Sequence, residues 1–253
     1  MLLKVRHFLV FCLFCSQLSC AWAVNLYLTE VAPFAFSKDG KGNYDGINVR
    51  IVNELVKRSG VPIELIIVPS ARHVTMFPSD REAYSISQID NFSDRDGSVL
   101  FEVTQYPILA VAQRGAVLKT YEDLISLSAD RGIGVMRRLS YGGFGQDERV
   151  KKVEISTLEN GLRMLEIGRI SGIVGSQPAI MAAAEKNASS HLLGPSIIIA
   201  YGTHVMRVRP DFASSPTSKV LTTTLAAMKS DGSISRILDD FTKTPRPALP
   251  QVK

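Results

Sequence analysis

The most informative stretch of the sequence is residues 91–107, which reads NFSDRDGSVLFEVTQYP. It begins as a polar turn that carries one arginine, Arg95, and continues as an apolar run typical of a β-strand. A junction of this kind presents a guanidinium group, whose parallel N–H donors can hold a planar carboxylate. The alternative is a surface salt bridge between Arg95 and its neighbours Asp94 or Asp96, which would stabilise little.

The N-terminal segment, residues 1–23, has the composition of a signal peptide. Lys4 and Arg6 form a basic start, and residues 8–15 form an apolar core that is too short to cross a membrane as a helix. The sequence Ala-Trp-Ala at 21–23 fits a peptidase site. We therefore predict an exported, periplasmic protein whose mature chain begins after this site.

All cysteines of the chain lie in this segment, at Cys12, Cys15 and Cys20. A lipoprotein anchored through Cys20 is the alternative to simple cleavage, but Gln17 stands where a lipidation signal needs an aliphatic residue. After cleavage the mature chain would have no thiol, and therefore neither a disulfide nor a cysteine metal site. The four histidines are scattered without metal-ligand spacing, so we predict no metal site and no cofactor.

Length and charge exclude several classes of protein. A chain of 253 residues can bury a core in one large domain or in two lobes. The formal net charge is +5, and two of these charges belong to the signal segment. Because the remaining positive charge is mild and dispersed, we predict no nucleic-acid partner.

Strand-like and helix-like segments alternate along the chain, which indicates an α/β fold. The pattern predicts strands over residues 25–29, 63–68, 133–136, 171–175, 197–200 and 204–208. It predicts helices over residues 46–59, 157–168, 178–186, 219–229 and 233–241. Residues 201–203 are expected to separate the last two strands, Gly60 to end the first helix, Thr157 to cap the second, and Asp231 or Ser233 to cap the last.

Six segments in order resemble the bacterial extracellular solute-binding proteins, family 3, which are similar to periplasmic amino-acid-binding proteins. Residues 91–107 resemble the family's "T-x-E-R, four residues, x-F-S-x-P-Y", although Asp94 replaces the Glu and Tyr106-Pro107 stands where Pro-Tyr is usual. The other five are EVAPFAF at 30–36, YDGINV at 44–49, VPSAR at 68–72, GRISGIVG at 168–175 and DGSISRILDDF at 231–241.

This resemblance implies a two-lobed periplasmic-binding-protein-like fold of type II, with a ligand cleft between the lobes. The first lobe would hold residues 24–108 and 203–243, and the second would be the insertion 109–202. The crossing segments near 109–111 and 200–202 would form the hinge. The tail, residues 244–253, is rich in proline and is expected to be disordered.

The resemblance also implies the site. In the family the arginine of the T-x-E-R signature holds the ligand's carboxylate, so the resemblance favours the clamp reading of Arg95. Arg72 could face the same cleft or be an ordinary solvated helix residue, and Phe34 matches a ligand-facing position. Arg138 and Ser140 fall where the family begins a helix that can bind an anion.

The usual aspartate for a ligand's ammonium group is replaced here by Ser176, and Asp90 could supply the missing anion. The candidate ligand-binding residues are therefore Arg95, Phe34, Arg72, Asp90, Arg138, Ser140 and Ser176.

The expected function is that of a periplasmic solute-binding protein without chemistry of its own. It would capture a small polar ligand that bears a carboxylate, an amino acid or an organic acid, by closing its cleft. The partner would be an ABC permease or a membrane receptor, for transport or sensing, and we expect a monomer. No nucleophile–base pair, paired carboxylates or nucleotide loop is legible. The alternative is a periplasmic lyase or dehydratase on the same fold, similar to cyclohexadienyl dehydratase.

Overall fold

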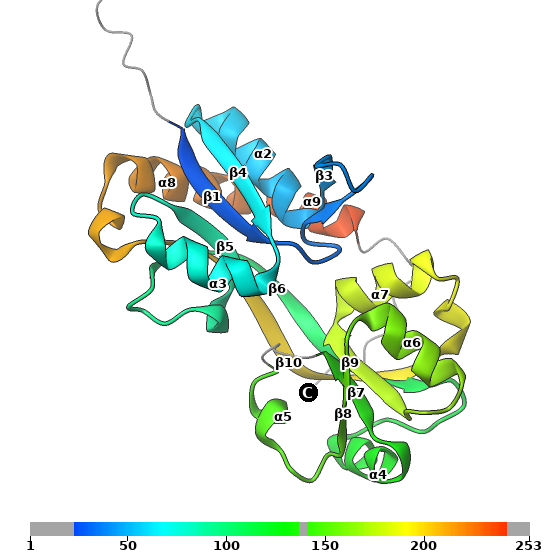
Figure 1. Ribbon diagram of the computed structural model, residues 1–253. Coiled ribbons are helices and arrows are strands. Elements are labelled where there is room, and N and C mark those ends of the chain that lie inside the picture. Colours follow the sequence, from blue (N-terminus) through cyan, green and yellow to red (C-terminus); the bar gives the residue numbers. More distant parts are fainter. Residues whose placement is uncertain (1–22, 137–140, 242–253) are drawn as a thin grey trace, which may run out of the picture.

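The computed structural model describes residues 23–136 and 141–241, which form two α/β lobes that share one eight-stranded sheet (Figure 1). The strands lie in the order β4-β1-β5-β10-β6-β9-β7-β8. Their bounds are β1 Val24–Thr29, β2 Phe36–Ser37, β3 Tyr44–Asp45, β4 Ile63–Val68, β5 Tyr84–Gln88, β6 Ser98–Gln113, β7 Ile133–Met136, β8 Lys152–Ile155, β9 Gly172–Ser176 and β10 Leu193–Val208. The helices are α2 Ile47–Ser59, α3 Ser70–Ser79, α4 Tyr121–Arg131, α5 Gly143–Gln146, α6 Leu158–Glu166, α7 Gln177–Lys186, α8 Pro216–Ser230 and α9 Ser233–Asp240, with short 3-10 turns η2 Ile89–Asn91, η3 Ser190–Leu192 and η4 Pro210–Phe212.

Two long antiparallel strands, β6 and β10, run from one lobe into the other. In the first lobe β10 pairs with β5 through residues 204–208, and β6 is the edge strand. In the second lobe β6 pairs with β9 through residues 108–112, and β10 is the edge strand. Each lobe therefore completes its sheet with the same two strands.

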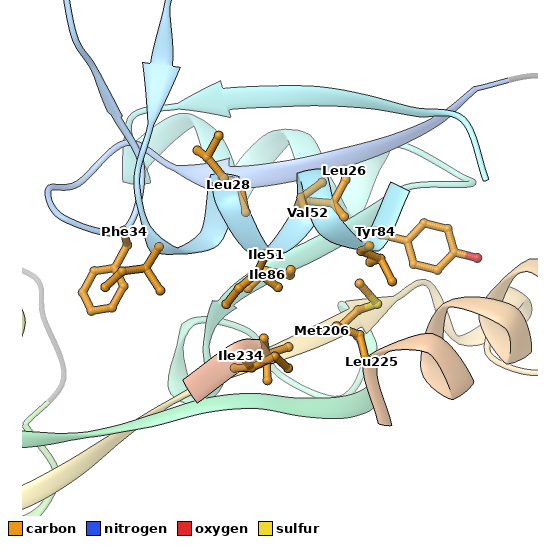
Figure 2. Packing of buried hydrophobic residues seen from close by; sticks show 14 of the residues in the cluster. Leu26, Leu28, Phe34, Ile51, Val52, Tyr84, Ile86, Met206, Leu225 and Ile234 are labelled. Carbon is orange, nitrogen blue, oxygen red and sulfur yellow. The ribbon is translucent and has the colours of Figure 1, made fainter. Parts of the chain in front are cut away.

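Each lobe is stabilised by hydrophobic clusters of its own. The first lobe packs α2, α8 and α9 against one face of its sheet, around Leu26, Leu28, Ile51 and Met206 (Figure 2). Its other face carries Tyr27, Phe77, Ala83 and Phe92, where α3 packs on β1. The second lobe has two further clusters, and their buried members lie between residues 108 and 197. The division into domains with the bounds given above stays a prediction.

Most elements expected from the sequence are confirmed within a few residues. Gly60 adopts a left-handed conformation with φ 68° and ends α2, as a glycine without Cβ can do. The Thr157 hydroxyl accepts a hydrogen bond from the N–H of Asn160 at 3.1 Å and begins α6. At α9 the predicted cap, Asp231 or Ser233, was wrong. The cap residue is Gly232, without a side-chain cap hydrogen bond, and the Asp231 carboxylate accepts a hydrogen bond from the N–H of Ser233.

One expectation about the strands was wrong. Residues 201–203 do not separate two strands, because β10 continues from Leu193 to Val208. Gly202 is needed for close packing rather than for a turn: a Cβ on it would lie 2.3 Å from the ring of Tyr106 on β6. Tyr106-Pro107 lies opposite this glycine in the same ladder, where Pro107 pairs with Tyr201.

The predicted list of helices did not include α3, α4 and α5. Helix α4 begins at a capping box, in which the hydroxyl of Thr120 accepts from the N–H of Asp123 and the carboxylate of Asp123 accepts from the N–H of Thr120. Helix α3 follows Pro69 and contains Pro78, so its propensity is poor. It is held by its tertiary contacts, since His73 and Phe77 are both buried.

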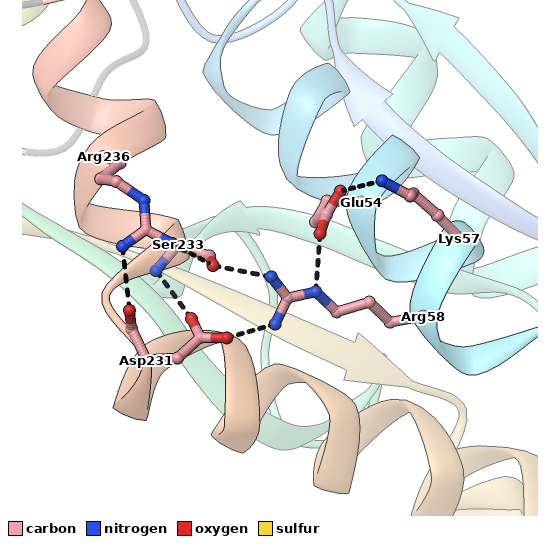
Figure 3. A network of polar contacts seen from close by, with 6 residues as sticks. All are labelled: Glu54, Lys57, Arg58, Asp231, Ser233 and Arg236. Carbon is pink, nitrogen blue, oxygen red and sulfur yellow. Dashed lines mark hydrogen bonds and ion pairs between the residues drawn. The ribbon is translucent and has the colours of Figure 1, made fainter.

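A polar network ties the end of α2 to the junction of α8 and α9 (Figure 3). The Arg58 guanidinium donates to Glu54 at 2.6 Å, to Ser233 at 2.7 Å, and to the carboxylate of Asp231. Arg236 donates to the Ser233 hydroxyl at 2.8 Å. These contacts anchor the C-terminal return of the chain on the first lobe.

We expect Arg58→Ala to lower the melting temperature by roughly 2–4 °C, because three partners lose one shared donor at the surface. The neighbouring Lys57→Ala is the matched control, since Lys57 only approaches Glu54 at 3.9 Å. Differential scanning calorimetry of both variants measures the difference. Equal effects of the two substitutions would show that the network adds nothing.

Candidate functional site

A cavity of about 840 Å³ is lined by residues of both lobes. The first lobe contributes the loop after β1, the start of α2, and the C-terminal end of β5. The second lobe contributes the starts of α6 and α7. Residues brought together from such distant parts of the chain form a site that depends on both lobes.

The floor of the cavity is aromatic. The ring of His204 lies 4.5 Å from that of Phe34 and 5.1 Å from that of Tyr106, and Phe34 lies 5.0 Å from Tyr106, between ring centroids. Asn48 contacts Nδ1 of His204 at 3.2 Å through its amide nitrogen. Burial lowers the pKa of His204 to about 3, so the ring is neutral. The floor thus offers apolar surface with neutral polar atoms.

Phe34 is fixed by the start of α2. The first N–H groups of that helix donate to the loop, from Ile47 to the carbonyl of Pro33 and from Asn48 to the carbonyl of Phe34, both at 2.9 Å. Gly46 adopts φ 137°, and a Cβ there would lie 2.5 Å from the carbonyl oxygen of Phe34. Only glycine lets the loop approach the helix this closely. Phe34 consequently stands at the end of the first-lobe cluster (Figure 2).

The second-lobe wall contains two helix starts. Ser156, Thr157 and Leu158 at the start of α6 line the cavity, as does Ser176, the residue before α7. Thr157 uses its hydroxyl for the cap, whereas Ser176 makes no side-chain cap hydrogen bond. The positive ends of both helix dipoles therefore meet this wall, where negative charge on a ligand is stabilised.

The charged side chains of the described lining are exposed, except that of Glu159, which is half-buried. They are Glu30, Lys38, Glu159 and Lys186. Lys38 lies 3.0 Å from Asp45, and Lys186 lies 3.7 Å from Glu159. The buried residues of the described lining are uncharged, which distinguishes this floor from one built around a buried ion pair.

The structure brings two of the predicted site residues, Phe34 and Ser176, to the cavity. Arg95, Arg72 and Asp90 are exposed and lie outside the cavity lining. The predicted contacts of Arg138 and Ser140 lie outside the described residues. The role predicted for each of them stays a prediction.

The loop that carries Arg95 is held by another arginine, Arg207 of β10. Arg207 is buried and donates to the carbonyls of Gly97 at 2.6 Å and Ile89 at 2.7 Å. Asp94 lies 3.8 Å from the same guanidinium. The Asp96 carboxylate instead accepts from the hydroxyl and the N–H of Ser93. The neighbouring aspartates therefore have other partners than Arg95.

The sequence analysis missed several lining residues. Thr29 and Ser87 stand at the C-terminal ends of the parallel strands β1 and β5, and Asn48, Tyr106 and His204 form the floor. The usable signal was positional, because ligands in open α/β sheets bind at the carboxyl ends of strands. Tyr106 and His204 carry no such signal, since they lie within the long strands.

A search for membrane-spanning helices in the described part of the chain found none with the required length and hydropathy. Among the residues at 23–136 and 141–241, no three His, Cys, Asp or Glu side chains gather as metal ligands would.

Two α/β lobes line one cavity, an arrangement typical of small-molecule sites. The family model of the bacterial extracellular solute-binding proteins, family 3, matches residues 26–244. The chain therefore belongs to this family, as the sequence motifs predicted. No curated protein matches the chain.

Solved structures confirm the periplasmic-binding-protein-like fold. The ligand-binding core of GluR0 in complex with L-glutamate matches with a TM-score of 0.70 and 13% identity, covering 88% of this chain and 99% of that one. A mutant of ArgBP from T. maritima matches with a TM-score of 0.62 and 16% identity, over 88% and 96% of the two chains. A histidine kinase sensor domain with similarity to periplasmic binding proteins matches with 0.64 and 16%, over 89% and 98%. At these identities the likeness shows the fold alone.

Proposed function

We propose that this chain is a periplasmic binding protein that closes on a small carboxylate ligand with an apolar body, an amino acid or an organic acid. The observation that carries the proposal is the cavity of about 840 Å³, with an aromatic floor in one lobe and two helix starts in the other. The apolar body would pack on Phe34 and Tyr106, and the carboxylate would face the helix starts. The captured ligand would be delivered to an ABC permease or read by a membrane receptor.

A thermal-shift screen tests this proposal. The panel contains amino acids, the corresponding acids without the amino group, and their uncharged amides. A ligand that binds only the folded state at 100 times its dissociation constant stabilises it by about 2.7 kcal/mol, or roughly 5–10 °C. We expect carboxylates to raise the melting temperature and amides to fail. A shift with the amides equal to that with the acids would contradict the carboxylate assignment.

The same mixtures distinguish binding from catalysis. A binding protein leaves its ligand unchanged, whereas a lyase or dehydratase on this fold would convert a prephenate-like acid. Chromatography of the mixtures after prolonged incubation measures product. Turnover that scales with protein concentration would replace the binding function by the enzymatic alternative.

Arg95 enters the proposal as the charged partner of the carboxylate in the closed form. Asn91, at the end of η2 and four residues before Arg95, lines the cavity, so closure needs to bring only the loop that follows it onto the ligand. We expect Arg95→Ala to weaken binding of the best acid about 30-fold or more, since truncating one member of a buried charged pair costs about 2–5 kcal/mol. Arg95→Lys should recover part of the affinity.

Calorimetric titration measures this effect, with Arg81→Ala as the control at another exposed arginine. The melting temperature without ligand should stay the same in all three variants, because Arg95 supports none of the core. Wild-type affinity in Arg95→Ala would make Arg95 a surface residue and would leave the family assignment intact.

A further inference from the structure

One tyrosine of the second lobe brings a buried hydroxyl to the cavity. Tyr141 lines the cavity and is only 6% exposed. Its Oη accepts a hydrogen bond from the backbone N–H of Met136 at 3.1 Å, and Met136 is itself a lining residue. The ring packs at its edge against Phe144, with 6.1 Å between the centroids, in a hydrophobic cluster of the second lobe. The hydroxyl is therefore held in place both by its ring and by its hydrogen bond.

The chemistry of this bond leaves the hydroxyl as a donor. A backbone N–H can only donate, so the phenol oxygen is the acceptor and its single proton is left for another partner. Within the described part of the chain no group accepts that proton. Burial raises the pKa of Tyr141 to about 12, so the hydroxyl stays protonated at neutral pH. A buried donor without an acceptor is costly, and an acceptor on the ligand would remove this cost.

The strand order places the hydroxyl between two helix starts. β7 lies between β9 and β8, and the three strands are parallel, so their carboxyl ends meet at one edge of the sheet. Met136 ends β7, Ser156 follows β8, and Ser176 ends β9. The last two residues lead into α6 and α7, and all three line the cavity. The donor of Tyr141 thus stands in the same row as the positive ends of two helix dipoles.

This wall has no anion to pair with a cation. The buried residues of the described lining are uncharged. The carboxylates of the described lining are Glu30, which is exposed, and Glu159, which lies 3.7 Å from Lys186. A ligand's ammonium group would lose its water here without gaining an ionic partner, and it would face the positive helix ends. Oxygen acceptors would instead gain hydrogen bonds and a favourable field.

We propose that Tyr141 is a ligand-binding residue and that, with the starts of α6 and α7, it selects acids that carry a second oxygen acceptor in place of an amino group. The second acceptor is an oxo group or another carboxylate. One acceptor takes the proton of Tyr141, and the other faces a helix start. Neighbouring strand ends lie about 4.8 Å apart, so the row of donors is wider than one carboxylate. This inference rests on the proposed binding function and narrows its ligand class.

The first test compares four probes that share an isobutyl group and differ in one substituent beside the carboxylate. They are 4-methyl-2-oxopentanoate, isobutylmalonate, 4-methylpentanoate and L-leucine. In calorimetric titration of wild type, we expect one of the two-acceptor acids to bind about 10-fold or more tightly than 4-methylpentanoate, since it alone satisfies both kinds of donor. L-Leucine should bind no more tightly than 4-methylpentanoate, because its ammonium group gains no anion.

The second test removes the donor and keeps the ring. In Tyr141→Phe the preference for the two-acceptor acid over 4-methylpentanoate should fall below about 3-fold. A purely structural role would weaken both probes alike and leave the ratio unchanged. Tyr121→Phe is the matched control, since that hydroxyl donates to Asp147 at 3.1 Å and Tyr121 lies outside the cavity lining. The ranking of the probes by wild type keeps the proposal testable if Tyr141→Phe does not fold.

The outcomes separate this inference from the function beneath it. An unchanged ratio in a folded Tyr141→Phe variant would overturn the role of the hydroxyl. Tighter binding of L-leucine than of both two-acceptor acids would overturn the ligand class. Binding of other carboxylates but of none of these four would overturn the inference and leave the proposed function standing. Failure of every carboxylate in the panel would overturn the proposed function itself.

Discussion

Gly46→Ala should destabilise the protein by about 3 kcal/mol or more, the combined cost of a strained backbone and an overpacked contact. The residue adopts φ 137°, and its new Cβ would meet the backbone oxygen of Phe34 at 2.5 Å. Backbone atoms cannot move aside as a flexible side chain can. Because the same contact positions Phe34, we also expect the remaining folded protein to bind its ligand less tightly.

Gly42→Ala is the matched control. Gly42 adopts φ 88°, but no heavy atom lies within 4 Å of its Cβ position. The substitution should therefore cost only the left-handed conformation, about 1–2 kcal/mol. Urea denaturation of the two variants measures both values. Equal losses would show that the approach of Phe34 to Gly46 is not what requires glycine.

Acid should destabilise the protein before its carboxylates titrate. Burial lowers the pKa of His73 to about 4 and that of His204 to about 3, whereas both sites in the unfolded chain titrate near 6.5. Between these values the unfolded chain binds protons that the folded protein does not. Stability is therefore full above pH 6.5 and falls as the pH drops. By pH 4.5 we expect a loss of about 2–3 kcal/mol for each histidine.

Urea denaturation between pH 7.5 and 4.5 measures this loss. His73→Gln and His204→Gln should each flatten the pH dependence. Asp45 does not interfere, because its hydrogen bonds with Arg50 hold the pKa of that carboxyl well below its usual range. Its contribution is lost only below about pH 4. A wild-type stability that is flat to pH 4.5 would contradict the assignment of two neutral buried rings.

The fold could be predicted because its signals are local. Gly60 and Thr157 mark helix ends by chemistry that acts over four residues, and the family motifs lie in the expected order. Gly202 misled the prediction, since the same residue type serves a turn or a close contact. Which of the two it serves depends on Tyr106, almost 100 residues away in sequence.

The site was harder to predict for the same reason. Phe34 and Ser176 could be found from their place in a motif, whereas His73 and Arg207 act through partners that only the folded chain brings near. Arg95 shows the opposite case. Its motif predicts a ligand contact, but its side chain is exposed to solvent. The loop that carries it is held by hydrogen bonds from Arg207.

β6 is the edge strand of the first lobe and β10 is the edge strand of the second. This arrangement affects how the protein unfolds. Each strand has 16 residues and supplies backbone hydrogen bonds in both lobes of the shared sheet. If either lobe unfolded, the other lobe would lose its hydrogen bonds between β6 and β10. The N–H and C=O groups exposed in this way would have to be solvated. The two lobes are thus expected to unfold as one cooperative unit, and bending between them must be absorbed by twisting a two-stranded ribbon rather than by opening a flexible linker.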